Sequence, residues 1–367
     1  MANLSTQRIT VGLPVYKGAD RIAKSLECLQ RQTFGNFEAI ISVDDNDAET
    51  AAACRPFLVD PRFRMVVQPR RLDWVGNFNW LLQQDLKEFF CYRQHDDTTA
   101  PEFFEVLLQA ADNETNAAAV YCDCQFIGRD DFQILHSIEG ESLDRMLQYI
   151  ERGSAVPVRG LIRRAAIQQA GLVRSDEFRA PHQIYGWLAK LVRWGNFRRI
   201  PKALYYKLEH PKNFTGDFFA KPEEQRRAAW PTIFTGLLEA AMPLCRTPEE
   251  RLYFQQTILG RLVTYRPFYP GKDSSGRLIT ECLERLRVEG NEHLLREEEV
   301  PRVIQEVETR LALFERSQIS RVLYDVRQRS RFGRLIYPKS RMRRVMYIVR
   351  YLLERFRYKM TRMLLPE

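Results

Sequence analysis

The sequence lacks the features that mark secreted and membrane-spanning proteins. Its first residues contain no apolar stretch of the signal-peptide kind, and no run of about 18 apolar residues occurs anywhere in the chain. The seven cysteines are an odd number and include no Cys-x-x-Cys pair, so neither a disulfide framework nor a cysteine metal site is expected. We therefore expect reduced, mostly buried thiols in a cytoplasmic protein that does not span a bilayer.

Long disorder is also not expected. Hydrophobic residues make up 45% of the 367 residues, aromatic residues 11% and charged residues 28%, which are ordinary values for a globular protein. A chain of this length has room for one large catalytic domain with an appended region.

Positive charge is concentrated at the end of the chain. Residues 316–367 contain 15 Lys and Arg against 3 Asp and Glu, whereas the whole chain carries +9, so the first 315 residues are slightly acidic. Between Arg341 and Leu365, apolar residues recur at helical spacing and arginines recur on another face, which is typical of a helix lying on an anionic membrane surface. The alternative is a helix packed on the catalytic domain. No nucleic-acid-reading motif accompanies the charge, so nucleic acid is not an expected partner.

Short apolar segments alternate with helical patterns in the first part of the chain. Strands are expected at residues 9–13, 39–43, 63–67, 89–92, 118–122 and 204–206. Pro14 is expected to end the first strand, and helical spacing indicates helices over 22–29 and 74–86. This order predicts an α/β fold with a doubly wound, mostly parallel sheet.

The pattern changes to all-helical further along the chain. We expect a catalytic domain over residues 1–215, a helical region over 216–315 and a basic amphipathic tail over 316–367. Because no signal peptide or membrane span is expected, we predict a cytoplasmic enzyme. Its basic tail would associate with the inner face of the plasma membrane.

Adjacent aspartates follow the second and fourth expected strands, as Asp44–Asp45 and Asp96–Asp97. Ligands bind beyond the carboxyl ends of the strands in doubly wound sheets. Mg²⁺ and Mn²⁺ prefer carboxylate oxygens and need few protein ligands when a diphosphate supplies others. The two clusters together therefore suggest a nucleotide held at one and its phosphates at the other. A solvated turn before the helix that follows Pro101 is the alternative for Asp96–Asp97.

Three stretches carry a pattern that goes beyond these spacings. The first two read ITVGLPVYKGADRIAKSLECLQRQTFGNFEAIISVDDNDAET and GNFNWLLQQDLKEFFCYRQHDDTTAPEFFE. The third runs from RGLIRRAAIQQAGLVRSDEF to PHQIYGWLAKLVRWGNFRRIPKALYYKLEHPKN, and together they span residues 8–213. These stretches resemble glycosyltransferase family 2, whose members have the GT-A fold. The resemblance implies an enzyme that takes a sugar from a nucleotide-sugar donor.

The resemblance assigns the first stretch to the nucleoside. Pro14 and Tyr16 would line the nucleobase pocket, and Asp45 would accept a hydrogen bond from the base with Asp44 beside it. Arg71 would contact the base or the phosphates.

The second and third stretches would hold the diphosphate. Asp96 would contact the ribose or the metal, Asp97 would ligate the Mn²⁺ or Mg²⁺ that bridges the diphosphate, and a loop with His210 and Asn213 would close over the phosphates. The sequence departs from the family pattern at Gln94, where the fuller acidic motif has a carboxylate.

A second departure concerns the catalytic base. The family places a carboxylate just before the helix that contains Trp187, and alignment on that residue puts His182 there. An inverting transfer needs a base for the acceptor hydroxyl, and a histidine with an ordinary pKa of about 6.5 is suited to the task. His182 is therefore the first candidate, with Asp176 or Glu177 second; a loop histidine without a catalytic role is the alternative.

The sequence thus predicts an inverting, metal-assisted glycosyltransferase of polysaccharide biosynthesis that acts on a hydroxyl of a glycan or lipid-linked acceptor. A catalytically silent nucleotide-sugar-binding protein is the alternative, because the expected carboxylate base is missing. A nucleotidyltransferase is a third reading. Its glycine- and lysine-rich phosphate loop would follow the first strand, where this chain has Pro14-Val15-Tyr16-Lys17.

Overall fold

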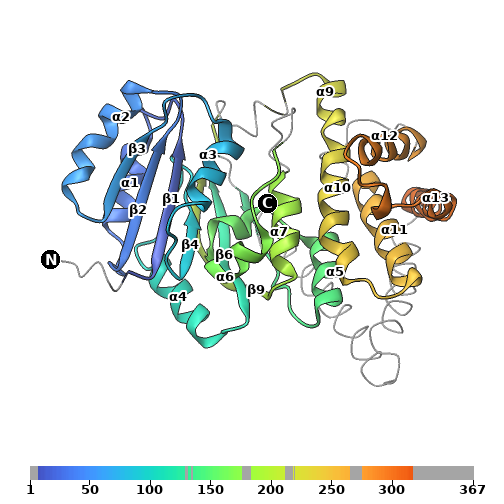
Figure 1. The fold of residues 1–367 in the computed structure, drawn as a ribbon. Coiled ribbons are helices and arrows are strands. Elements are labelled where there is room, and N and C mark those ends of the chain that lie inside the picture. The colour runs from blue at the N-terminus through green and yellow to red at the C-terminus, as the bar shows by residue number, and fades with distance from the viewer. Residues whose placement is uncertain are drawn as a thin grey trace.

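A mixed sheet and a group of helices make up the two sides of the molecule (Figure 1). The computed structural model of the 367-residue chain describes residues 7–128, 131–133, 135–175, 183–210, 218, 220–264 and 275–316. All seven cysteines carry free thiols, and five of them are buried. Among the described helices, none is long and apolar enough to cross a membrane.

The sheet is mostly parallel, as the sequence predicted. Its order is β3-β2-β1-β4-β8-β6-β9-β5, with β7 paired to β6. The strands are β1 (Ile9–Val15), β2 (Phe37–Val43), β3 (Phe63–Val67), β4 (Phe89–Tyr92), β5 (Thr98–Thr99), β6 (Ala117–Ile127), β7 (Asp131–Gln133), β8 (Leu161–Arg163) and β9 (Asn196–Leu208). Strands β3, β2, β1 and β4 are parallel neighbours, so their carboxyl ends lie at one edge of the sheet.

The first strand runs one residue past Pro14, so the prediction that this proline ends it was wrong. The reason lies in the pairing of β1. Its ladder with β4 stops at Gly12, whereas its ladder with β2 continues to Val15, whose carbonyl accepts the N–H of Asp44 at 2.8 Å. Alternate residues of a strand direct their N–H groups to opposite neighbours, so the N–H that Pro14 lacks would point toward β4, where pairing has ended.

Helices pack on the sheet through their apolar faces. They are α1 (Ile22–Gln30), α2 (Ala48–Cys54), α3 (Asp73–Leu82), α4 (Phe103–Asn113), α5 (Ser142–Arg152), α6 (Arg164–Ala170) and α7 (Gln183–Val192). In α1, Ile22, Leu26 and Leu29 are fully buried at helical spacing, as the sequence predicted. Helix α3 packs against β1 and β2, and α4 packs against β6, β8 and β9.

The remaining described helices form the second side of the molecule. They are α9 (Glu223–Ala228), α10 (Trp230–Ala241), α11 (Pro248–Thr264), α12 (Ser275–Val288) and α13 (Val300–Arg316). Helix α10 lies against α7, where a side chain on Gly186 would sit 3.1 Å from the Cα of Gly236 (Figure 1). Two glycines therefore let these helix backbones approach closely. The expected boundary at residue 215 falls outside the described residues and stays a prediction.

Candidate active site at the carboxyl edge of the sheet

Both aspartate clusters lie at the carboxyl edge of the sheet. Asp44 and Asp45 follow the last residue of β2, and Asp96 and Asp97 lie in the turn after β4. Strand β1 runs between β2 and β4 and is parallel to both, so the structure brings the clusters to the same edge. This is the edge at which open α/β sheets bind ligands.

Asp44 is a structural anchor in the first cluster. Its buried carboxylate accepts the N–H groups of Leu72 at 2.7 Å and Asp73 at 3.0 Å, where α3 begins. The Nε of Arg71 lies 3.3 Å from the same carboxylate. Burial raises the pKa of Asp44 above its ordinary value, although these hydrogen bonds and Arg71 oppose the shift. Asp44 thus fixes the loop that carries Arg71, and a carboxylate also suits a helix N-terminus.

The residues predicted for the nucleobase lie around Tyr16. The guanidinium carbon of Arg71 is 3.3 Å from the centre of the Tyr16 ring, so the cation lies over the face of the ring. Pro14 is half-buried on the same strand end. Asp45 is exposed in the left-handed conformation, with φ of 60°, and its carboxylate accepts no hydrogen bond from the described residues. This side therefore offers an unoccupied acceptor beside a planar cation and an aromatic ring.

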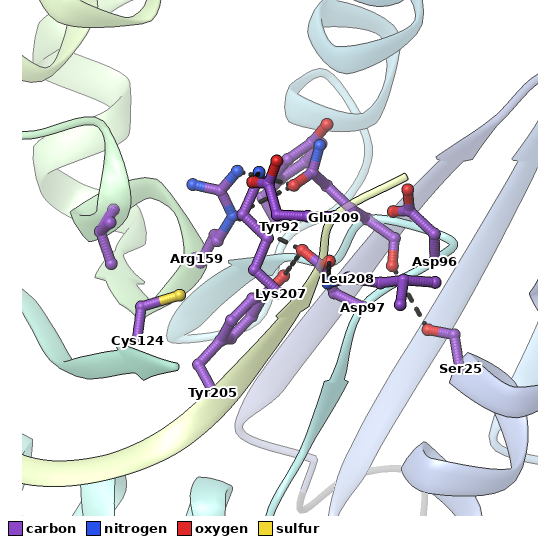
Figure 2. A network of polar contacts seen from close by, with 12 residues as sticks. Ser25, Tyr92, Asp96, Asp97, Cys124, Arg159, Tyr205, Lys207, Leu208 and Glu209 are labelled. Atoms are coloured by element: carbon purple, nitrogen blue, oxygen red, sulfur yellow. Dashed lines mark hydrogen bonds and ion pairs between the residues drawn. The ribbon is translucent and has the colours of Figure 1, made fainter. Parts of the chain in front are cut away.

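Asp97 points into the protein. Its Oδ2 accepts the hydroxyl of Tyr205 at 2.6 Å, and its Oδ1 accepts the N–H of Leu208 at 3.0 Å (Figure 2). The side chain is 1% exposed. Burial raises the pKa of Asp97 to about 6, while Arg159 and the two donors act in the opposite direction. Both oxygens are thus used to hold the end of β9.

Asp96 points away from this network toward the other side of the turn (Figure 2). Its Oδ2 lies 2.9 Å from Nε2 of His210, which follows β9. The side chains of Asp96 and His210 are 11% and 14% exposed. The Nδ1 of His210 is buried and has no hydrogen-bond partner among the described residues, and Oδ1 of Asp96 accepts no hydrogen bond from them. The two predicted residues therefore meet and retain capacity for a ligand.

Sequence reasoning missed Arg159 and Tyr205. Arg159 ends the short 3₁₀ segment Val156–Arg159 and donates to Oε1 of Gln94 from Nε at 3.2 Å and Nη2 at 2.6 Å. Its Nε is 3.7 Å from Oδ2 of Asp97, and its guanidinium lies 5.8 Å from the Tyr205 ring centre (Figure 2). The departure at Gln94 was visible in the sequence, but nothing local identified its partner.

Four predicted residues lie outside the described part of the chain. They are Asp176, Glu177, His182 and Asn213. Helix α7 begins at Gln183, directly after His182, and the Gln183 side chain donates to the Thr232 hydroxyl of α10 at 2.9 Å.

Comparison with known proteins finds a family match and similar folds. Residues 10–171 match the family model described as glycosyl transferase family 2. The crystal structure of S. aureus TarS residues 1–349 aligns with a TM-score of 0.50 at 15% identity, covering 83% of this chain and 91% of that one. Its complex with UDP-GlcNAc aligns with a TM-score of 0.50 at 16% identity and the same coverage. The mannosyltransferase PcManGT from Pyrobaculum calidifontis, in complex with GDP-Man and Mn²⁺, has 12% identity, coverages of 86% and 90%, and a TM-score of 0.49.

The sheet and the family match define the class: the chain is a nucleotide-sugar glycosyltransferase with a GT-A type α/β fold. The similarity to glycosyl transferase family 2 covers residues 10–171, somewhat less than half of the 367-residue chain.

Proposed function

We propose that this enzyme transfers a sugar, with inversion at the anomeric carbon, from a nucleotide-sugar donor to a hydroxyl of a glycan or lipid-linked acceptor in polysaccharide biosynthesis. One observation carries the proposal: two open carboxylates occur at one edge of the sheet, Asp45 next to the Asp44 that contacts Arg71, and Asp96 beside His210. In this proposal the nucleoside binds at the first group and the diphosphate at the second.

The second group fits a divalent cation, Mn²⁺ or Mg²⁺. Asp96 supplies a carboxylate oxygen, Oδ1, that no described residue occupies, and His210 holds the other oxygen, Oδ2, through Nε2 at 2.9 Å. Within the described ranges, no cluster of three or more His, Cys, Asp or Glu side chains is placed to hold a metal ion. The diphosphate and water would therefore complete the shell, as is usual for these ions. The cation would neutralise charge that develops on the leaving diphosphate.

Asp97, the other predicted ligand, serves differently in this proposal. Because Tyr205 and Leu208 already donate to both of its oxygens, it holds the end of β9 and so sets the position of His210, two residues beyond Leu208. Asp97 would then act on the cation through strand β9 rather than by direct contact.

We retain His182 as the proposed base that accepts the proton of the attacking hydroxyl, with Asp176 or Glu177 as alternatives. The support is its sequence position immediately before α7, whose first residue is tied to α10. Separate substitution of each candidate, followed by the pH profile of kcat, distinguishes them, since only the true base should remove the acidic limb.

Transfer and hydrolysis assays with Mn²⁺ test the overall proposal. The donor panel contains UDP- and GDP-sugars, beginning with UDP-GlcNAc, which the TarS complex holds. Asp96→Ala should abolish turnover and remove the Mn²⁺-dependent part of nucleoside diphosphate binding. Asp85→Asn is a matched control, because Asp85 is exposed and precedes β4 at the opposite edge. Donor binding without turnover in the native protein would favour the silent binder, and failure to bind any donor would contradict the proposal.

We also propose that the basic tail, residues 316–367, contacts an anionic membrane surface at the inner face of the plasma membrane. The support is its net charge of +12 and its amphipathic pattern, since each cation near such a surface contributes about 1 kcal/mol. Co-sedimentation with phosphatidylserine vesicles compares the full chain with one that ends at residue 315. Equal binding of the two would contradict this role.

A further inference from the structure

Arg159 is a fixed cation with a neutral partner. Two of its nitrogens, Nε and Nη2, donate to the amide oxygen of Gln94. Among the described residues, the carboxylate that forms an ion pair with Arg159 is that of Asp97, 3.7 Å away, which already accepts hydrogen bonds from Tyr205 and Leu208. An amide accepts hydrogen bonds but does not cancel charge, whereas a carboxylate at position 94 would pair with the guanidinium in a bidentate ion pair. The glutamine thus orients Arg159 and leaves its charge available.

One edge of this guanidinium has no partner among the residues that the structure describes. Nη1 forms no hydrogen bond or ion pair with the described residues. It is also not one of the buried atoms that lack a hydrogen-bond partner. The side chain is 13% exposed, so a small part of it reaches solvent. Because its other two nitrogens already donate hydrogen bonds, Arg159 loses little further side-chain conformational freedom when this edge binds an oxyanion.

The backbone places Arg159 beside the turn that carries Asp96 and Asp97. Strand β8 pairs antiparallel with β4, which brings the segment before β8 next to the residues that follow β4. A Cβ on Gly160 would lie 2.2 Å from the carbonyl oxygen of Val120, so only glycine permits this approach. The position of Arg159 is therefore built into the sheet.

We propose that Arg159 binds an oxyanion of the donor diphosphate, sharing the neutralisation of its charge with the cation. The inference rests on the proposed function, since it assumes that a diphosphate occupies the Asp96 side. Its consequence is that a nucleoside diphosphate retains affinity without metal. Glutamine instead of a carboxylate at position 94 has a second consequence. It makes the turn less acidic, and so it lowers the affinity of the turn for a divalent cation.

Calorimetric titrations of UDP, GDP and inorganic pyrophosphate, each with Mn²⁺ and with EDTA, test the inference. Arg159→Gln should weaken diphosphate binding in EDTA by about 10- to 100-fold, the size expected for one charge-assisted hydrogen bond. Gln94→Glu should also weaken binding in EDTA, although Arg159 is retained, and it should bind Mn²⁺ alone more tightly. Arg198→Gln is the matched control, since Arg198 is 46% exposed near the amino end of β9.

Outcomes against the inference are distinct from failure of the proposed function. If Arg159→Gln binds the diphosphates in EDTA as Arg198→Gln does, or if Gln94→Glu changes neither affinity, the inference is wrong. A loss seen with sugar nucleotides but not with UDP, GDP or pyrophosphate would assign Arg159 to the sugar and also overturn it. Absence of nucleoside diphosphate binding by the native protein with Mn²⁺ would instead contradict the proposed function. Circular dichroism verifies that each variant is folded.

Discussion

Replacement of Asp97 by asparagine tests the burial of this carboxylate through the pH dependence of stability. In the folded protein its pKa is raised from 3.8 to about 6, because burial disfavours the charged form. The folded state therefore binds the proton more tightly than the unfolded state, and stability present below the unfolded pKa is lost as pH rises through the folded one. A shift of this size corresponds to about 3 kcal/mol, of which about 2 kcal/mol falls between roughly pH 4.5 and 7.5.

Asparagine removes this dependence with little change of shape. Its amide oxygen can still accept the Leu208 N–H, and its amide group can donate to the oxygen of Tyr205. The substitution also changes the charge next to Arg159, which alters the unfolding free energy. This change depends little on pH in this range, because the guanidinium stays protonated. Between pH 4.5 and 7.5, Asp97→Asn should therefore gain about 2 kcal/mol of unfolding free energy relative to the native protein.

Urea denaturation at a series of pH values, followed by circular dichroism, measures this difference. The titrations contain EDTA, since a cation bound next to Asp97 would shift its pKa. Asp85→Asn is the control for the loss of an exposed carboxylate and should differ from the native protein by a constant amount. A difference between Asp97→Asn and the native protein that stays constant with pH would refute the reasoning, because it would mean that Asp97 titrates normally.

Two further variants probe contacts around the site. Tyr205→Phe removes the hydroxyl that donates to Asp97 at 2.6 Å, so unfolding free energy should fall by about 1.5–3 kcal/mol at neutral pH. The pKa of Asp97 should also rise, which moves the pH-dependent loss of stability upward in the same urea series. Gly186→Ala places a methyl 3.1 Å from the Cα of Gly236 and should lower stability by about 1–3 kcal/mol in thermal unfolding. Gly35→Ala, whose nearest neighbour atom is 3.9 Å away, should stay within about 0.5 kcal/mol.

The fold could be predicted wherever the chain carries its pattern locally. Strands β3 and β4 have the predicted bounds, because each contains a short apolar run, Met65-Val66-Val67 in β3 and the buried Phe89-Phe90-Cys91 in β4. Strand β9 begins at Asn196, whereas the sequence indicated only residues 204–206. Its first half contains exposed Arg198 and Lys202 and pairs with β6 through several register shifts. A polar strand of this kind is specified by its neighbour, which no local pattern reveals.

The same limit applies to the site. The aspartate clusters were found because a strand end is a local feature, and parallel strands bring such ends together. The partner of Asp97 is Tyr205, 108 residues away, and the partner of Gln94 is Arg159, 65 residues away. The contacts of each aspartate depend on those distant residues, so sequence could identify the pair but could not show which partner each side chain meets.

In the structure these two adjacent side chains meet different partners, so Asp96 and Asp97 hold different parts of the turn. Asp97 meets Tyr205 and the end of β9, and Asp96 meets His210, which that end of β9 carries. Substitutions at the two positions should therefore differ in kind. Loss of the Asp96 carboxylate should change the affinities for the cation and the diphosphate, with little effect on folding. Loss of the Asp97 carboxylate should mainly change the pH dependence of stability. It should change diphosphate affinity only through the position of His210.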